Sequence, residues 1–165
     1  MSNFTAAGIL PRSTYNNQDY YYFGVTKNKG ELTTFCGNKD ASDKNVKACA
    51  IREFNEESLG AIADKKTIKK VLGDKKKVKK IENNKAKQVT YIATLKIKGN
   101  PLAKFQKAVK KPGLPAHKKE ITEIVAIPRA QVIQLIASGN HYYQGRLFRG
   151  DAWGTLDIAN QHGKL

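Results

Sequence analysis

The sequence predicts an α/β fold with a central mixed sheet, because strand-like and helix-like segments follow one another along the chain. Residues 88–97 alternate apolar and polar side chains, the period of a half-buried strand, whereas apolar positions from residue 46 onward recur at helical steps. A chain of 165 residues is about the size of one domain and can bury a hydrophobic core without disulfides. We therefore expect a single domain, residues 1–165, with one functional site.

Strands are expected in the first part of the chain. Residues 4–10 form a short apolar run closed by Pro11, and residues 20–26 form a run rich in Tyr, Phe and Val. A third β-prone run, residues 32–36, stops at Gly37. Polar turns separate these runs, so we expect the chain to open with a hairpin.

A helix is expected after a loop of small, polar and charged residues at 37–45. Asp43 or Asn45 is available as its N-cap, and Gly60 is the natural terminator. The apolar positions that recur at three- and four-residue steps, and so form one buried stripe, are Val46, Cys49, Ala50 and Phe54.

The second half of the chain is expected to add two strands and two helices. After the strand at 88–97, residues 101–111 are compatible with a basic amphipathic helix that starts at a proline. Residues 121–127 are expected to form a strand and residues 129–137 a helix that stops near Gly139. The remaining aromatic stretch, from His141 to Trp153, is expected to cap the sheet.

The charge balance favours phosphate-rich partners. Thirty Lys and Arg against fourteen Asp and Glu give a net charge of +16. Eleven lysines lie in the lysine-rich segment at about 64–87, which is predicted to be a short helix with a mobile basic connection, or a charged hairpin. The lysines indicate either a surface that attracts RNA or a phosphorylated small molecule, or a merely solvated loop.

The cysteines and the hydropathy pattern exclude several classes. Cys36 and Cys49 belong to no CxxC or Cys/His cluster, so neither zinc nor a disulfide framework is indicated. No charged segment followed by an apolar run opens the chain, and no run of about eighteen apolar residues occurs. We therefore expect no membrane partner and a cytoplasmic location.

An acidic cluster on the helix after residue 45 is the most informative feature. Glu53 lies three residues before Glu56 and four before Glu57, so all three carboxylates project toward one side of a helix. Like charges at this spacing destabilise a helix by roughly 0.2–0.5 kcal/mol per pair, and a hard divalent cation removes that repulsion. Mg²⁺ or Mn²⁺ is the expected cofactor, and a solvated acidic face is the alternative.

The segment around this cluster, residues 35–60, resembles the Nudix box. Phe35 and Gly37 fall where family members start the loop with Phe-x-Gly-Gly, and a strand, loop, helix and glycine surround the match as the family requires. The residues that match the helical core of the box in place are Arg52, Glu53, Phe54, Glu56 and Glu57.

Three positions depart from the Nudix pattern. The first required glycine falls at Asn38, a residue that tolerates left-handed backbone, and the lone upstream glutamate falls at Lys44, beside Asp43, which can supply the carboxylate. The glycine after the glutamates falls at Leu59, and Gly60 follows one residue late, which implies a slightly longer helix end.

The resemblance implies a Nudix-like α/β/α sandwich and a set of residue roles. Glu53, Glu56 and Glu57 become the metal ligands, and Arg52 becomes their orienting partner. The general base is one of these glutamates, or Glu120 or Glu123 near the strand at 121–127, although exposed glutamates that merely flank a strand are the alternative. Substrate contacts are expected from Gly37, Asn38 and Lys39.

The function implied is metal-dependent hydrolysis of a pyrophosphate linkage in a nucleoside diphosphate derivative, capped RNA or another polyphosphate. A catalytically impaired Nudix-fold module that binds RNA or a phosphorylated ligand is the alternative, motivated by Lys44 and the altered glycines. An acidic-helix interaction protein is a third hypothesis. The Tyr-rich run at 20–23 is expected to be strand core, with base stacking as its alternative.

Overall fold

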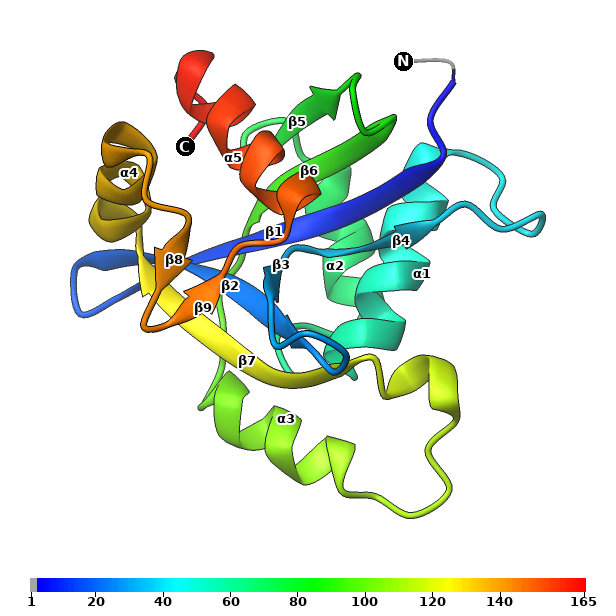
Figure 1. The fold of residues 1–165 in the computed structure, drawn as a ribbon. Coiled ribbons are helices and arrows are strands. Elements are labelled where there is room, and N and C mark those ends of the chain that lie inside the picture. The colour runs from blue at the N-terminus through cyan, green and yellow to red at the C-terminus, as the bar shows by residue number, and fades with distance from the viewer. Residues whose placement is uncertain (1–2) are drawn as a thin grey trace.

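A mixed sheet separates two helical layers in the computed structural model, which describes residues 3–165 (Figure 1). Five strands follow the order β3-β2-β1-β6-β5, while β4 pairs with β1 and β7 pairs with β2. The pairing of β1 with β6 is parallel, and the other pairings in this sheet are antiparallel. The strands are β1 (Ala6–Tyr15), β2 (Gln18–Thr26), β3 (Leu32–Thr33), β4 (Phe35–Asn38), β5 (Val78–Asn83), β6 (Gln88–Thr94) and β7 (Ile121–Pro128).

Helices cover both faces of this sheet. α1 (Val46–Ser58), α2 (Lys65–Leu72) and α3 (Pro101–Val109) bury their apolar sides against one face, and α4 (Arg129–Ser138) and α5 (Gly150–Gln161) against the other. Strand alternation divides the core, since Ile9 and Tyr22 join the first cluster whereas Leu10 and Tyr21 join the second. The expected α/β/α sandwich with a central mixed sheet is therefore confirmed.

Strand β1 is longer than expected and runs through Pro11 instead of ending there. Its antiparallel neighbour is β4 as far as Ile9 and β2 from Arg12 onward. Pro11 has no opposite residue in either antiparallel ladder, so its missing N–H removes no bond from them. Proline thus marks the point where the strand changes partner.

The predicted opening hairpin is present, with a tight turn between β1 and β2. Asn16 and Asn17 both adopt positive φ, at 49° and 61°, as the hairpin turn requires. The lysine-rich segment holds both structures that were considered for it: α2 is the short helix, and β5 forms a hairpin with β6.

The start of α1 agrees with one of the two predicted N-caps, whereas its end is not the longer one that was expected. Asn45 is the N-cap, since its side chain accepts a hydrogen bond from the Ala48 amide, and Asp43 is not. The helix ends at Ser58 and is not lengthened, because Leu59 itself takes the left-handed C-cap conformation at φ 54°. Asn38 ends strand β4 opposite Ala6, so its backbone does not adopt the left-handed conformation that was expected there.

The aromatic C-terminal stretch covers the second face of the sheet, as expected, but it does so with a helix that periodicity did not predict. A small hairpin of β8 (Tyr142–Tyr143) and β9 (Arg146–Leu147) precedes α5. Phe148 packs edge-on against Phe23, and His141 stacks on Trp153 with ring centroids 4.0 Å apart. No helix within residues 3–165 combines the length and apolar character needed to cross a bilayer.

Replacement of Gly8 by alanine is expected to destabilise the fold by about 2 kcal/mol, as overpacking does. A Cβ at this position would overlap the Cβ of Cys36 and the Phe35 carbonyl oxygen, where β1 and β4 pair. Urea unfolding followed by circular dichroism measures the loss. Gly150→Ala is the matched control, because nothing lies within 4 Å of a Cβ there; equal stability of the two variants would contradict the prediction.

Candidate active site

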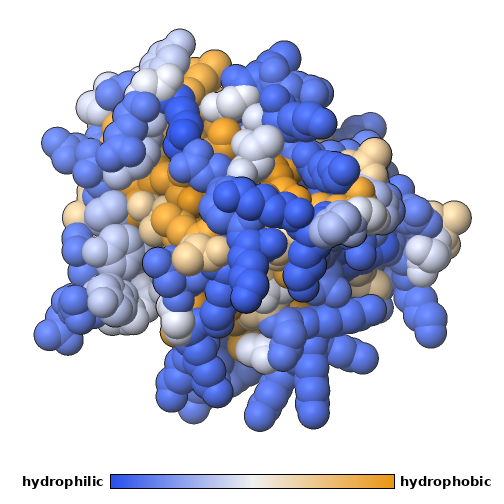
Figure 2. All heavy atoms as spheres, turned by 90° about the horizontal axis from the view of Figure 1, so that it is seen from below, coloured by the Kyte–Doolittle hydropathy of each residue, from blue (hydrophilic) through white to orange (hydrophobic). Residues whose placement is uncertain are grey.

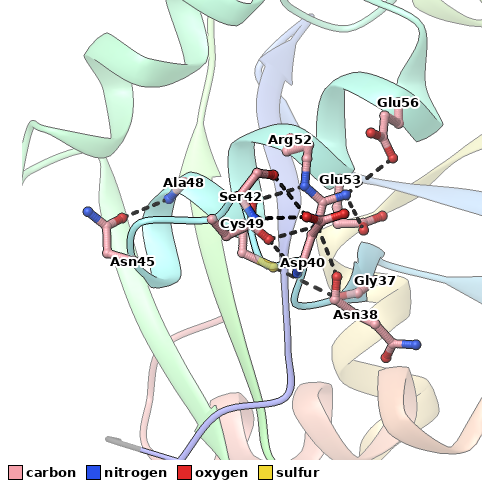
Figure 3. Close-up of polar contacts among 11 residues, drawn as sticks. Gly37, Asn38, Asp40, Ser42, Asn45, Ala48, Cys49, Arg52, Glu53 and Glu56 are labelled. Carbon is pink, nitrogen blue, oxygen red and sulfur yellow. Dashed lines mark hydrogen bonds and ion pairs between the residues drawn. The ribbon is translucent and has the colours of Figure 1, made fainter.

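The guanidinium of Arg52, in the middle of α1, is the centre of a polar network that reaches the loop before this helix (Figure 3). Its Nε and one terminal nitrogen donate to both oxygens of Asp43, at 2.9 and 2.8 Å. The other terminal nitrogen donates to Glu53 at 2.8 Å and, more weakly, to Glu56 at 3.4 Å. A further bond of 2.9 Å reaches the Asn38 carbonyl oxygen, so one side chain ties the loop to the helix.

Asp43 supplies the carboxylate that the sequence lacks at Lys44. Its side chain is only 3 % exposed, whereas Lys44 is exposed to solvent. Hydrogen bonds from Arg52 hold the pKa of Asp43 at about 2, well below its usual range. The carboxylate expected from this neighbouring position is therefore present as the partner of Arg52.

Glu53 is packed against the backbone of β4. Its carboxylate lies so close to Gly37 that a Cβ there would overlap Oε2, so the position accepts only glycine without displacing the glutamate. Burial raises the pKa of Glu53, although the hydrogen bond and charge of Arg52 oppose this rise. Gly37, within β4, therefore leaves the space that the Glu53 carboxylate occupies.

Glu57 is the most deeply buried of the three carboxylates. Its Oε1 atom is buried and has no hydrogen-bond partner within the described residues. Burial raises the pKa of Glu57 well above its usual value, and the charges of Glu53 and Glu120 raise it further. Arg149 is the cation that opposes this shift. An unpaired buried carboxylate oxygen is costly and indicates a missing partner.

Glu57 borders a cleft of about 530 Å³ that also contains Glu120. The β2–β7 pairing places Glu120 beside Lys27, since the Lys27 amide after β2 donates to the Glu120 carbonyl at 2.8 Å. Four cations stand around the same cleft: Lys27, Lys29, Lys119 and Arg149. Acidic and basic side chains thus share one opening, as a site for a metal-bound phosphate requires.

The cations of the cleft were missed in the sequence because they come from three separate segments. Lys27 and Lys29 belong to the turn after β2, and Lys119 precedes β7. Arg149 is half-buried and bonds Asp151 at 2.6 and 2.7 Å and the Cys36 sulfur at 3.7 Å. The sequence signal that could have indicated Arg149 is its position within the aromatic C-terminal stretch.

Other predicted site residues lie outside this cleft. Glu123 forms an ion pair of 2.6 Å with Arg146, and Glu56 faces Arg52. Gly37 and Asn38 contact the Glu53–Arg52 network, while the Lys39 ammonium lies 5.1 Å from the Phe4 ring. The structure therefore places Glu57 and Glu120 in one cleft, with Glu53 one helical turn before Glu57, and pairs Glu123 with Arg146 instead.

The donor set at this site suits a hard cation. Within residues 3–165, no three His, Cys, Asp or Glu side chains are already gathered as metal ligands, and Arg52 engages both Glu53 and Glu56. The unpaired oxygen of Glu57 and the mutual repulsion of Glu53, Glu57 and Glu120 are nevertheless what a divalent cation would relieve. The residues present fit Mg²⁺ or Mn²⁺ bound through carboxylate oxygens.

Asp43→Asn is expected to destabilise the protein by about 2 kcal/mol near neutral pH, from the depression of the Asp43 pKa to about 2. Because that pKa is depressed, the stabilisation is complete above pH 4 and is lost as the pH falls toward 2. Urea unfolding of both proteins across this range gives the difference. Asp157→Asn, which removes a carboxylate bonded to Gln161, is the control; a pH-independent difference would exclude the ion pair as its source.

Comparisons with known proteins identify the fold. No protein-family model matches the sequence, and no curated protein matches it significantly. The NUDIX domain of Shewanella oneidensis NrtR, solved with ADP ribose, superposes with a TM-score of 0.55 at 11% identity, over 98% of this chain and 89% of that one. Another structure of Shewanella oneidensis NrtR gives a TM-score of 0.51 at 12% identity, over 94% of this chain and 60% of the other. The chain therefore has the Nudix fold.

Proposed function

We propose that this protein is a divalent-metal-dependent hydrolase of the Nudix type that cleaves a pyrophosphate linkage. The observation that carries the proposal is the buried, unpartnered oxygen of Glu57 at the edge of a cleft that also holds Glu120 and four cations. Such an oxygen is stabilised by a cation, and the surrounding lysines suit the oxygens of a diphosphate.

Three carboxylates of α1 are the proposed ligands of the metal. Glu53 and Glu57 would hold the metal, and Glu56, at 25 % side-chain exposure, is the third ligand that the Nudix resemblance implies. Arg52 orients Glu53 through its 2.8 Å bond. When bound, Mg²⁺ or Mn²⁺ supplies charge neutralisation of the diphosphate oxygens and a lower pKa for the attacking water.

Lys27, Lys29 and Lys119 would bind the phosphate groups. All three line the cleft, and their ammonium groups provide point charges that follow a flexible phosphate chain. Arg149 is less free to do so, because Asp151 already binds its guanidinium at 2.6 and 2.7 Å. Its charge instead opposes the raised pKa of Glu57.

Glu120 is the stronger of the two candidates for general base outside the box. It lines the cleft beside Glu57, whereas Glu123 is paired with Arg146. In the proposed step, a water oxygen forms a bond to phosphorus, the bridging P–O bond breaks, and the leaving phosphate oxygen keeps the electron pair. The proton of the attacking water passes to the Glu120 carboxylate.

The substrate class is a nucleoside diphosphate derivative, with capped RNA and other polyphosphates as the larger members. The Shewanella oneidensis NrtR domain, which was solved with ADP ribose, adds that compound to the set worth testing. The net charge of +16 favours substrates with several phosphates over nucleotide sugars.

Glu56→Gln and Glu57→Gln are each expected to lower turnover by two orders of magnitude or more, because each removes a metal-binding charge. The measurement is phosphate or nucleotide release from ADP-ribose, dinucleoside polyphosphates, capped RNA and diphosphoinositol phosphates, with Mg²⁺ or Mn²⁺. Circular dichroism confirms that the variants fold. If the unmodified protein binds these compounds but hydrolyses none of them, the hydrolase proposal is wrong and a Nudix-fold binding module takes its place.

Glu120→Gln is expected to lower kcat by about 10²–10⁴ with little change in KM, as loss of a general base does. Glu123→Gln is the matched control, since it makes the same change three residues along the same segment but breaks only the Arg146 ion pair. A larger effect from Glu123→Gln than from Glu120→Gln would reverse the assignment.

A further inference from the structure

A lysine-lined hollow lies between α2 and the end of β6, away from the carboxylate cleft. Its volume is about 1070 Å³, and Asp74 is the one carboxylate that lines it. The helix α2 buries Ile68, Val71 and Leu72 in the core, so its lysines project outward. The lysines that line the hollow, all solvent-exposed, are Lys66, Lys69, Lys70, Lys77 and Lys96.

These five lysines carry charge that nothing within residues 3–165 neutralises by a direct ion pair. Three of them, Lys66, Lys69 and Lys70, occupy successive positions on one side of α2. Their mutual repulsion opposes the helix by roughly 0.2–0.5 kcal/mol per pair. An anionic ligand would remove that repulsion, so the hollow is electrostatically prepared for phosphates.

An aromatic pocket of about 580 Å³ adjoins the lysine hollow. Tyr15, Tyr20 and Tyr22 line it from the β1–β2 hairpin, and Leu102 lines it from the first turn of α3. Tyr15 is 66% exposed and Leu102 is 36% exposed, which is unusual for side chains of this size. No charged residue lines this pocket.

The hollow and the pocket adjoin each other, because Thr14 and Ile97 line both, and together they are called the groove. Figure 2 views the molecule from below and shows long hydrophilic side chains around a patch of apolar surface. The lining residues give the groove cations along one part and tyrosine rings at the adjoining part. It shares no lining residue with the cleft of Glu57 and Glu120.

We propose that this groove binds a single strand of nucleic acid, with its phosphates on the lysines and a base against the tyrosines. Binding of single strands without sequence preference combines these two elements, a basic track and an aromatic platform. A duplex keeps its bases stacked inside and offers none to the tyrosine pocket. A membrane surface fits less well, since the apolar side of α2 is buried in the core and cannot insert.

Three side chains that line the pocket already use their hydroxyl groups within the protein. The Tyr22 hydroxyl already bonds the Ser13 hydroxyl at 2.7 Å, and Thr14 donates to Asp19 at 2.6 Å. Tyr20 donates to Gln18 at 2.9 Å. Because these hydroxyls are engaged internally, we expect stacking on the tyrosine rings to contribute more to base binding than hydrogen bonds from these groups.

The test uses a labelled oligouridylate with a 5′-hydroxyl end and fluorescence anisotropy in the presence of EDTA. This probe contains no pyrophosphate and no metal is available, so its binding does not depend on the proposed hydrolase activity. The triple variant Lys66→Gln, Lys69→Gln, Lys70→Gln is expected to make the slope of log affinity against log salt shallower by about 2. Tyr15→Ser, at an exposed position, is expected to weaken binding about tenfold.

Matched controls separate the groove from general charge. The control variant changes three other exposed lysines to Gln, and these lysines line neither part of the groove: Lys47, Lys85 and Lys110. It therefore removes the same charge from elsewhere on the surface. Equal losses in the two triple variants would overturn the proposal. So would unchanged affinity in Tyr15→Ser, or equally strong binding of duplex RNA or of phosphatidylserine vesicles that compete with the oligonucleotide.

Discussion

The bidentate ion pair between Arg52 and Asp43 holds the candidate active site together. Arg52 also reaches the Asn38 carbonyl, so one guanidinium fixes both ends of the loop between β4 and α1. A guanidinium presents five N–H donors in a fixed plane, and a lysine could not serve these acceptors at once. The remaining nitrogen holds Glu53, which lies over Gly37. The arrangement of Asp43, Glu53 and Glu56 therefore depends on one cation.

Helix α1 has to satisfy two opposing demands. Its inner side packs Cys49, Ala50 and Phe54 in the core, and Phe54 meets Phe35 edge-on at 5.6 Å. The same side carries Glu53 and Glu57, whose burial raises their pKa values. The aromatic and apolar contacts on either side of these glutamates offset the free-energy cost of burying their charges, because they hold the helix against β1 and β4.

Much of the fold and part of the site could be predicted from the sequence. The periodicity from residue 46 onward and at 88–97 reflects local burial, so α1 and β6 were expected, although β6 ends at Thr94. The expectation of two helical layers around the sheet came from the Nudix resemblance. Helix α5 was missed because its buried side is made largely of small residues, such as Ala152 and Ala159, that leave a weak apolar pattern. Strand pairing is a tertiary property, so the cleft that joins Lys27 to Glu120 could not be inferred from either segment.

The surroundings of the two cysteines make their thiols unreactive toward oxidants. Cys36 and Cys49 are both buried and unbridged, and burial raises each thiol pKa to about 12. At neutral pH only on the order of one thiol in 10⁵ is then a thiolate, the form that peroxides and disulfides attack. Cys36 lies beside Arg149, but the charges of Glu57 and Asp151 work against its ionisation. Glu57, which borders the cleft, thus also helps to keep the neighbouring sulfur protonated and unreactive.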